Sequence, residues 1–381
     1  MLPSTCRGKS VCTKKIFTGR FLIFCLLTLT TVVYGLILLI KPNILSSFKT
    51  ATNINCGSSC CLASTKKYFC GSSNVTNGSS ACPNSRLDNI DFKNNEINSQ
   101  RDEERAFFLE TSGSGTLNFR QACSVESLAL HNTNLTVNVL FVGRKDNTSL
   151  ILQTLKENYN NINFIRINLD NYIARTPLEN WYLGNEWNTG PFKVSHLSDG
   201  LRFLTLYKYG GYYFDLDVIS VNTVTYYRNF VVAEDDDYLG SSVMHADFKN
   251  PLMQLAIQDF VANYRSDDAG YNGPGLLLRV LKKLCNVLDV QSMDYISCRG
   301  INVLHYSSFY PVHCSETEEL LIHRWPNETA KPTWLTQKVI GVHTWNRLTY
   351  NKPIYKKSTQ YYSWLTRVNC PLIFGIADDV F

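Results

Sequence analysis

Short apolar runs alternate with amphipathic segments through the middle of the chain. Residues 107–113, 137–142 and 162–169 are nearly continuous apolar runs, which is typical of strands buried on both faces. Residues 118–131 and 149–159, which lie between them, have the spacing of helices. Strands that alternate with helices predict an α/β fold with a mostly parallel central sheet flanked by helices.

A longer helix is predicted next, and it has a clear end. Leu197, Leu201 and Leu204 recur at the spacing of one helical face. Gly210 and Gly211 follow, and glycine adopts the backbone conformation that ends a helix at no steric cost. We therefore expect the helix to stop there and to lead directly into a strand.

Residues 212–221 are rich in aromatic and β-branched residues and predict a single strand that carries Asp215 and Asp217. Side chains two residues apart on a strand share a face, so Leu216 would point to the opposite face. Carboxylate oxygens are ligands that Mg²⁺ and Mn²⁺ prefer, often together with phosphate groups. An isolated D-x-D triplet is more often a solvated strand end, so the motif needs support from its surroundings.

That support comes from Asp199 and Arg202, which are three residues apart on the preceding helix and share a neighbouring face. Buried carboxylates without a compensating partner are costly, and Arg202 offers such a partner. Ligands of parallel sheets bind outside the carboxyl ends of the strands, where Asp215 is expected to lie. The sequence contains neither G-x-G-x-x-G nor G-x-x-x-x-G-K-[ST], so it does not support the usual dinucleotide and P-loop sites.

Two later segments add candidate site residues. Gly273 lies in the turn Y-N-G-P-G before an amphipathic helix predicted over residues 276–284, and it is either a plain helix start or part of a wall lining a sugar pocket. His343 closes a short apolar strand within residues 339–346. A lone histidine is usually structural, but histidine is also a common metal ligand and could complete a site with the two aspartates.

The N-terminus predicts a membrane anchor. Residues 21–40 contain no charge and are long enough to span a bilayer core. Residues 1–20 contain lysine and arginine but no acidic residue, which predicts a cytosolic tail and a luminal remainder. The alternative is a cleaved signal peptide, but the apolar run is longer than usual and lacks a clear cleavage site.

The remainder divides into a stem at residues 41–105 and a catalytic domain at residues 106–381. The stem is rich in Ser, Asn and Gly, with little periodicity. Ten cysteines follow the anchor, so disulfides are expected in an oxidising compartment. The cluster from Cys56 to Cys82 matches no common zinc pattern. Five N-x-S/T sequons also suit a luminal domain, and they lie at Asn74, Asn77, Asn134, Asn147 and Asn327.

Charge and composition narrow the class of protein. The net charge is +5 and the basic residues are scattered, without the basic stripe of a nucleic-acid binder. Only one membrane span is visible, which argues against a structural membrane protein. The many aromatic residues suit sugar-stacking walls or an aromatic core. The oligomeric state stays open.

Motifs spread over residues 105–370 resemble those of the α-1,4-galactosyltransferase and α-1,4-N-acetylglucosaminyltransferase family. They are F-F-L-E-T-S-G from Phe107, C-S-V-E-S from Cys123, T-P-L-x-x-W-Y from Thr176, L-S-D from Leu197 with Arg202, G-G-x-Y-x-D-x-D from Gly210, G-P-x-L-L-x-R-V-x-K-K from Gly273, C-R-G from Cys298, F-Y-P from Phe309 and V-H-x-W-N from Val342. The middle residue of D-x-D is Leu216, where threonine is familiar in the family.

The resemblance implies a GT-A-like fold, a UDP-sugar donor, Mn²⁺ and retention of the anomeric configuration. By position, Asp215 and Asp217 would hold the metal and the diphosphate, with His343 as a further metal ligand. Asp199 and Arg202 resemble residues that contact the donor sugar. Asp199, Arg202 and Asp217 are the predicted catalytic residues. Gly273 is a candidate donor-binding residue.

The resemblance also implies a type II Golgi enzyme that transfers a hexose, with galactose first, to a glycolipid. A GlcNAc or GalNAc donor and a glycoprotein acceptor are the alternatives. A lectin of the same fold without activity is the alternative from another class, but it need not keep Asp199, Arg202, Asp215 and Asp217 together. Because the sequence offers no residue that can be assigned as nucleophile, we expect front-face attack, in which the leaving phosphate helps deprotonate the acceptor.

Overall fold

The computed structural model describes residues 93–94, 97, 104–143, 148–323 and 331–381, and the statements that follow concern these residues. The predicted tail at 1–20, the anchor at 21–40 and nearly all of the stem lie outside them. Within the described ranges, no helix has the length and apolarity needed to cross a membrane.

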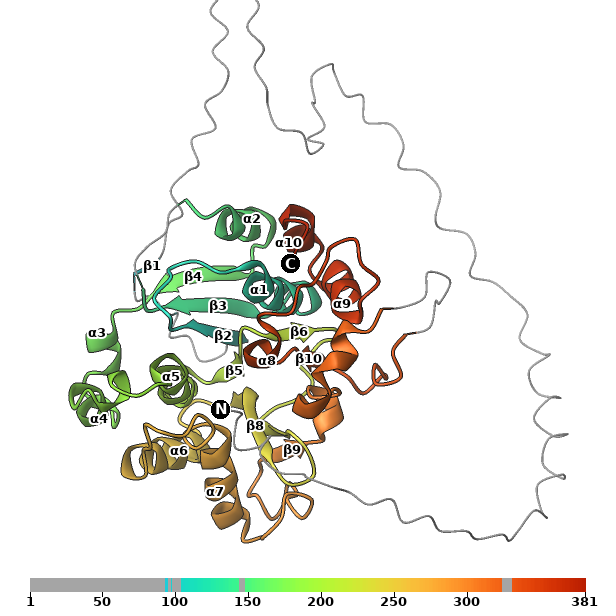
Figure 1. Ribbon diagram of the computed structural model, residues 1–381. Helices are drawn as coiled ribbons and strands as arrows, with labels where there is room; N and C mark the ends of the chain where they lie inside the picture. The colour runs from blue at the N-terminus through green and yellow to red at the C-terminus, as the bar shows by residue number, and fades with distance from the viewer. Residues whose placement is uncertain (1–92, 95–96, 98–103, 144–147, 324–330) are drawn as a thin grey trace, which may run out of the picture. The chain divides into compact units, whose positions relative to one another are not determined.

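An eight-stranded, mostly parallel sheet forms the centre of the domain (Figure 1). In spatial order its strands are β1 (Lys93–Asn94), β4 (Ile162–Arg166), β3 (Thr136–Phe141), β2 (Arg105–Glu110), β5 (Gly211–Phe214), β8 (Leu239–Ala246), β7 (Phe230–Ala233) and β9 (Asn302–Leu304). Only β8 runs antiparallel to its neighbours, β5 and β7. The predicted α/β class with a mostly parallel central sheet is therefore confirmed.

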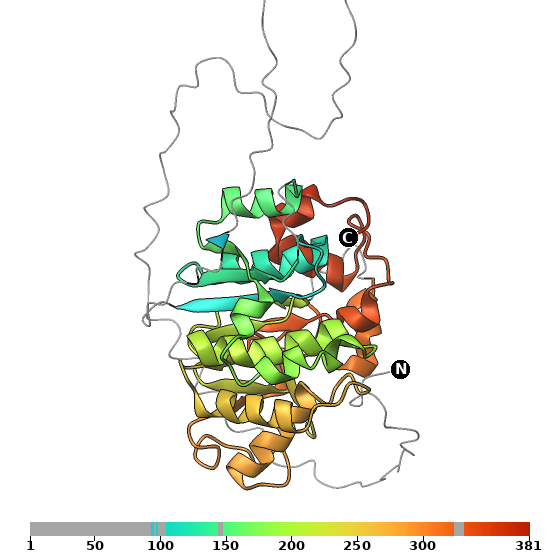
Figure 2. The same cartoon turned by 90° about the vertical axis from the view of Figure 1, so that its left-hand side faces the viewer.

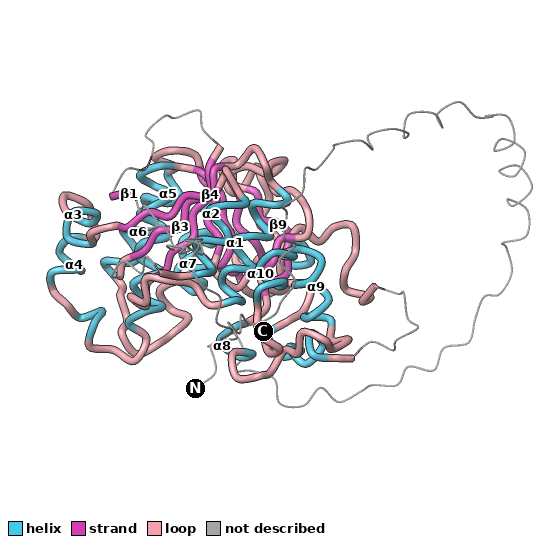
Figure 3. Tube along the Cα trace, turned by 90° about the horizontal axis from the view of Figure 1, so that it is seen from above, coloured by secondary structure: helices cyan, strands magenta, loops and turns pink. Residues whose placement is uncertain are grey.

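Helices cover both faces of the sheet. One face packs against α1 (Phe119–His131), α2 (Leu150–Asn158), α9 (Tyr361–Asn369) and α10 (Pro371–Ile376). The other packs against α5 (Lys193–Tyr209), α6 (Pro251–Ala262) and α7 (Pro274–Cys285), and Figure 2 views the molecule from the side of α5. Figure 3 shows the strands enclosed by helices.

Shorter helices fill the connections of this framework. They are α3 (Leu169–Ile173), α4 (Glu179–Leu183), α8 (Asn346–Thr349) and the 3₁₀ turns η2 (Glu186–Asn188), η3 (Tyr306–Ser308) and η4 (Cys314–Leu321).

Alternation along the strands explains the two cores. Phe107 and Phe108 are both fully buried, but Phe107 packs into the core under α5 and Phe108 into the core under α1. Successive side chains on a strand point to opposite faces, so a strand covered on both faces must be apolar at every position. This is why the apolar runs of the sequence are continuous.

The predicted helix ends agree with the observed caps. The side chain of Asn118 accepts a hydrogen bond from the Gln121 amide, and the Gln121 side chain accepts one from the Asn118 amide, which together form a capping box. Helix α5 ends at Gly210 and Gly211, whose φ angles are +67° and +103°. A Cβ atom on Gly211 would lie 2.5 Å from the Arg105 carbonyl oxygen, so glycine is required there.

Two predicted strand boundaries are wrong. The segment 162–169 ends as a strand at Arg166, and helix α3 begins at Leu169. The single strand predicted over residues 212–221 is two strands, β5 and β6 (Val218–Ser220), which belong to different sheets. Asp215 and Asp217 therefore lie in the turn between these strands, and the argument that they share one strand face does not hold.

Strand β6 pairs antiparallel with β10 (Gly341–His343) in a separate two-stranded sheet. His343 is the register partner of Val218, the residue directly after Asp217. This pairing joins two segments more than a hundred residues apart in the sequence, and it brings the histidine to the D-x-D turn.

The domain contains disulfides, as the cysteine content predicts, and one of them joins segments 247 residues apart. Cys123 in α1 is bonded to Cys370 between α9 and α10, and Cys285 is bonded to Cys298. Cys314 is disulfide-bonded as well. The cysteines from Cys56 to Cys82 lie outside the described residues. Of the five sequons, Asn134 is described and is exposed.

Candidate active site

A cavity of about 740 Å³ opens at the carboxyl ends of the central strands. Thr111 and Ser112, which follow β2, line it together with Asp215, which follows β5. Of the five predicted site residues besides Asp215, four also line it, namely Asp199, Arg202, Asp217 and His343. The cavity thus lies where ligands bind in open α/β sheets.

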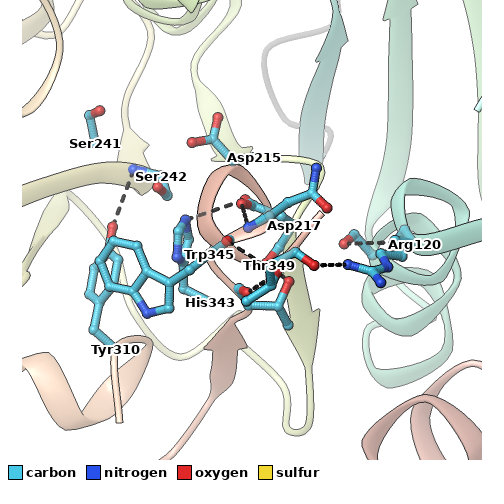
Figure 4. Close-up of polar contacts among 12 residues, drawn as sticks. Arg120, Asp215, Asp217, Ser241, Ser242, Tyr310, His343, Trp345 and Thr349 are labelled. Carbon is cyan, nitrogen blue, oxygen red and sulfur yellow. Dashed lines mark hydrogen bonds and ion pairs between the residues drawn. The ribbon is translucent and has the colours of Figure 1, made fainter. Parts of the chain in front are cut away.

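Asp215, Asp217 and His343 form the one cluster among the described residues whose ligand atoms could share a metal ion, and these atoms lie within 4.8 Å of one another. The His343 Nε2 atom lies 3.3 Å from Asp217 Oδ1. Figure 4 shows Asp217 and His343 joined by this contact, with Asp215 beside them. The antiparallel pairing of β6 with β10 places the histidine here.

The backbone around Asp217 is held by the segment that follows His343. The Thr344 amide donates to the Asp217 carbonyl at 2.8 Å, and the Thr344 hydroxyl donates to the same oxygen at 2.9 Å. The Asn346 amide donates to Asp217 Oδ2 at 2.9 Å. Trp345, between them, has a φ angle of +53°, an uncommon conformation for a tryptophan. One carboxylate oxygen is thus oriented by the backbone, and the other faces His343.

Helix α5 supplies Arg202, which connects two of the acids. Its guanidinium lies 3.1 Å from Asp199 Oδ1 and 3.3 Å from Asp215 Oδ1. Its Nη1 atom also donates to the Ser241 carbonyl at 2.7 Å, and Nε donates to the Ser198 carbonyl at 3.4 Å. All three nitrogen atoms therefore have protein acceptors, so this cation orients and neutralises carboxylates.

Tyr213 is a positioning residue to which the sequence analysis assigned no role. It is buried, and its hydroxyl donates to Asp215 Oδ1 at 2.6 Å. The Arg202 guanidinium lies 4.8 Å from the centre of the Tyr213 ring, within the range of a cation–π contact. Asp215 is thus held from two sides, by the Tyr213 hydroxyl and by the Arg202 guanidinium.

The Asp217–His343 pair favours its charged form. Burial alone raises the pKa of Asp217, but His343 and the Asn346 amide outweigh burial and lower it. Burial alone lowers the pKa of His343, but the Asp217 carboxylate outweighs burial and raises it. The Nδ1 atom of His343 is buried and has no hydrogen-bond partner among the described residues. The positive charge of protonated His343 and the negative charge of ionised Asp217 compensate each other in this position.

Asp199 behaves differently, because burial dominates. Burial raises its pKa to about 6, even though Arg202 lowers it and Asp215 adds to the rise. The folded protein binds more protons than the unfolded chain between the ordinary pKa of 3.8 and about 6. Ionisation of Asp199 therefore costs stability as the pH rises through this window, and the ionised form required for a donor contact is complete only above it.

We expect kcat/KM to rise with pH through about 6, because Asp199 must be ionised to pair with Arg202 and accept a hydrogen bond from a donor hydroxyl. A pH profile of kcat/KM for wild type and Asp199→Asn tests this. The variant should have much lower activity and should lose the rise near pH 6. A wild-type profile that is flat from pH 5 to pH 7 would contradict the role of Asp199.

Gly273 lies next to these groups but does not itself line the cavity, whereas its neighbour Pro274 does. A Cβ atom on Gly273 would lie 2.5 Å from Asp199 Oδ1 and 3.0 Å from Ser241 Oγ. Gly273 is also the N-cap of α7. Gly273 thus marks the start of helix α7 and lies close to Asp199. Donor binding by Gly273 stays a prediction.

Several residues of the cavity wall were missed by the sequence analysis. Glu110 ends β2, and Glu234 follows β7 and is 5% exposed. Both lie at strand ends, as Asp215 does, and this position could have indicated from the sequence that they line the cavity. Trp345 and Arg347 also line the cavity, and no spacing pattern indicates them.

Two family models match the chain in succession. Residues 118–237 match the glycosyltransferase sugar-binding region containing a DXD motif. Residues 245–377 match the conserved region of α-1,4-glycosyltransferases. The first match contains Asp199, Arg202 and the D-x-D turn, and the second contains Gly273 and His343. The two matched regions therefore meet at the cavity.

Curated relatives are similar over most of the domain. The lactosylceramide 4-α-galactosyltransferase of Rattus norvegicus is 29% identical over 269 residues, which cover 70% of this chain and 73% of the relative. The human α-1,4-N-acetylglucosaminyltransferase is 27% identical over 277 residues, which cover 69% of this chain and 78% of the relative.

Solved structures are similar to this chain at lower sequence identity than the curated relatives. The PaToxG glycosyltransferase has a TM-score of 0.40 at 15% identity, over 52% of this chain and 73% of that chain. The galactosyltransferase LgtC, solved with donor and acceptor sugar analogues, has a TM-score of 0.38 at 12% identity, over 72% of this chain and 96% of that chain.

An α/β sheet whose strand ends hold a D-x-D turn in a large cavity, together with the matched sugar-binding region, defines a DXD glycosyltransferase. The conserved region matched by residues 245–377 and the two relatives place it more closely. The chain is a hexosyltransferase that is similar to the α-1,4-glycosyltransferases over its matched region.

Proposed function

We propose that this enzyme is a metal-dependent, retaining α-1,4-galactosyltransferase that uses UDP-galactose and extends the terminal sugar of a glycolipid. The convergence of Asp215, Asp217 and His343 at the cavity that also contains Asp199 and Arg202 is the observation that carries the proposal. The 4-α-galactosyltransferase relatives support galactose as the sugar. Transfer of GlcNAc is the second candidate, because the human N-acetylglucosaminyltransferase is nearly as similar.

We further propose a type II protein of the Golgi membrane, with residues 21–40 as the anchor and the catalytic domain in the lumen. The charge-free run, the basic tail before it and the disulfides of the domain support this location. Detection of glycan on Asn134, which is exposed, would agree with a luminal domain.

The donor set fits Mn²⁺. Asp215 and Asp217 would supply carboxylate oxygens and His343 would supply Nε2, a mixture that suits a divalent first-row metal. The cluster of carboxylates at the cavity agrees with a bound cation, and His343 would release its proton on binding the metal. When bound, the metal would act as a Lewis acid on the diphosphate of the donor.

The chain's own residues would perform the remaining tasks of transfer. Arg202 neutralises Asp199 and Asp215 and keeps their carboxylates oriented toward the cavity. Asp199 would accept a hydrogen bond from a donor hydroxyl and so fix the orientation of the sugar ring. Tyr213 and the Asn346 amide hold Asp215 and Asp217 in place before the donor arrives, which lowers the reorganisation needed for reaction.

Retention would follow from front-face attack, in which the departing phosphate oxygen takes the proton of the acceptor hydroxyl. The glycosidic bond to the phosphate breaks as the new bond forms on the same face. Glu110, Asp199 and Glu234 are the buried carboxylates of the cavity that a covalent route would use instead. With front-face attack, we expect mass spectrometry to find no sugar adduct after donor is mixed with the enzyme. An adduct on any of these three residues would establish the covalent route.

A screen of UDP-sugars against a panel of glycolipid acceptors tests the proposed activity directly. We expect release of UDP with UDP-galactose and a lactose-terminated glycolipid, an α-1,4 linkage in the product and loss of activity after chelation. Preference for UDP-GlcNAc would favour the second candidate. Sugar binding without release of UDP from any donor would favour the lectin alternative.

A further inference from the structure

Five carboxylate side chains line the cavity, while few cations are available there to meet a diphosphate. The acids are Glu110, Asp199, Asp215, Asp217 and Glu234. Carboxylates repel a diphosphate unless cations compensate. Arg202 does not provide a free cation, because each of its three nitrogen atoms already has a protein acceptor.

Arg347 is a second arginine at this cavity, and its charge is uncommitted. It is exposed, and no carboxylate of the described residues lies within ion-pair distance of it. Its guanidinium carbon lies 5.1 Å from the centre of the Phe192 ring, within the range of a cation–π contact. Arg347 and Phe192 both line the cavity, Arg347 from α8 and Phe192 from the position before α5.

Position relates Arg347 to the D-x-D turn. It directly follows Asn346, whose amide lies 2.9 Å from Asp217 Oδ2. The carbonyl of Thr349 at the end of α8 accepts a hydrogen bond from Arg120 at 2.8 Å (Figure 4). Arg120 also donates to the Lys352 carbonyl. The segment that carries Arg347 is therefore fixed at both ends, while the guanidinium itself keeps its five N–H donors available.

We infer that Arg347 binds the diphosphate of the nucleotide donor and stabilises the charge that remains on it after the sugar leaves. A guanidinium recognises phosphate oxygens through two parallel N–H groups, with more geometric specificity than an ammonium. This assignment rests on the proposed function, since it presumes a nucleotide-sugar donor. The two arginines then have different roles: Arg202 orients carboxylates, and Arg347 contacts the ligand.

Binding of UDP and of uridine by the full chain in the presence of Mn²⁺ tests the inference. Arg347→Gln should weaken UDP binding by about tenfold or more, which corresponds to about 1.4 kcal/mol. Uridine lacks phosphate, so its affinity should stay within about twofold. With saturating acceptor, the same variant should lower kcat as well as raise KM for the donor, because charge on the leaving group grows in the transition state.

Matched variants exclude a structural explanation. Phe192→Leu removes the ring contact but keeps the charge, and Lys193→Gln removes the other exposed cation that lines the cavity. Each should bind UDP within about threefold of wild type, and Arg347→Lys should restore part of the affinity. Equal UDP binding by wild type and Arg347→Gln, or an equal loss in Phe192→Leu or Lys193→Gln, would overturn the inference. If wild type itself binds no UDP, the proposed function fails instead.

Discussion

Asp217→Asn should lower kcat/KM by about 10³-fold or more while leaving the fold intact. Asparagine has the same shape and can still accept the hydrogen bond from the Asn346 amide, and the Thr344 contacts involve only the backbone of residue 217. What the variant loses is the negative charge beside His343 at 3.3 Å. A neutral amide is a far weaker ligand for a hard cation and cannot compensate a charge on the metal.

Steady-state kinetics with Mn²⁺, thermal unfolding and calorimetric titration of the metal measure the three expected effects of Asp217→Asn. Activity and metal affinity should fall together, and the unfolding temperature should change little. Asp379→Asn, which alters an exposed carboxylate 4.0 Å from Lys357, serves as the matched control and should be neutral. Near-normal activity of Asp217→Asn with Mn²⁺ present would remove Asp217 from the metal site.

Arg202→Gln should have the largest effect on stability, about 3–5 kcal/mol at neutral pH. The substitution leaves Asp199 buried without its cation and removes the partner of Asp215. Burial alone would lower the pKa of Arg202, but Asp215, Tyr213 and Asp199 outweigh it and raise the pKa, so the cation is strongly held in the fold. Activity should fall as well, because both carboxylates lose their fixed orientation.

The pH dependence of this loss distinguishes charge from packing. Arg202 lowers the pKa of Asp199 in wild type, so in Arg202→Gln this carboxylate takes up its proton at a higher pH, and the stability difference between wild type and variant should shrink as the pH falls toward about 6. Thermal unfolding at pH 7.5 and pH 5.5 measures it. The double variant Arg202→Gln with Asp199→Asn should recover part of the stability at pH 7.5. A loss that is equal at both pH values and is not recovered would indicate that packing, not charge, explains the effect.

Local signals account for most of the framework. The apolar runs at β2, β3 and β4 are continuous because helices cover both faces of the sheet, and this pattern is readable from the chain alone. The cap at Asn118 and the glycines that end α5 are local as well, since they depend on a few neighbouring residues. The Asp199–Arg202 pair lies on one helix, and the residues of the D-x-D motif lie in the turn after the strand that follows this helix.

The strand predicted through Asp215 and Asp217 shows where local reasoning fails. Propensity could not show that Val218 leaves the central sheet to pair with β10, because strand pairing depends on a segment far away in the sequence. The turn that results still points both carboxylates into the cavity. The site was therefore predicted correctly, although the local geometry predicted for its two aspartates was wrong.

The sequence by itself determined the class of fold, the acidic motif and the partner arginine, because each depends on periodicity or on spacing within about twenty residues. Only the tertiary structure decided that His343 meets Asp217, that Arg202 is saturated by protein acceptors and that Glu234 and Arg347 line the same cavity. The physical reason is that these contacts join strand ends and loops distant in the chain, and their meeting depends on how the sheets pair and pack.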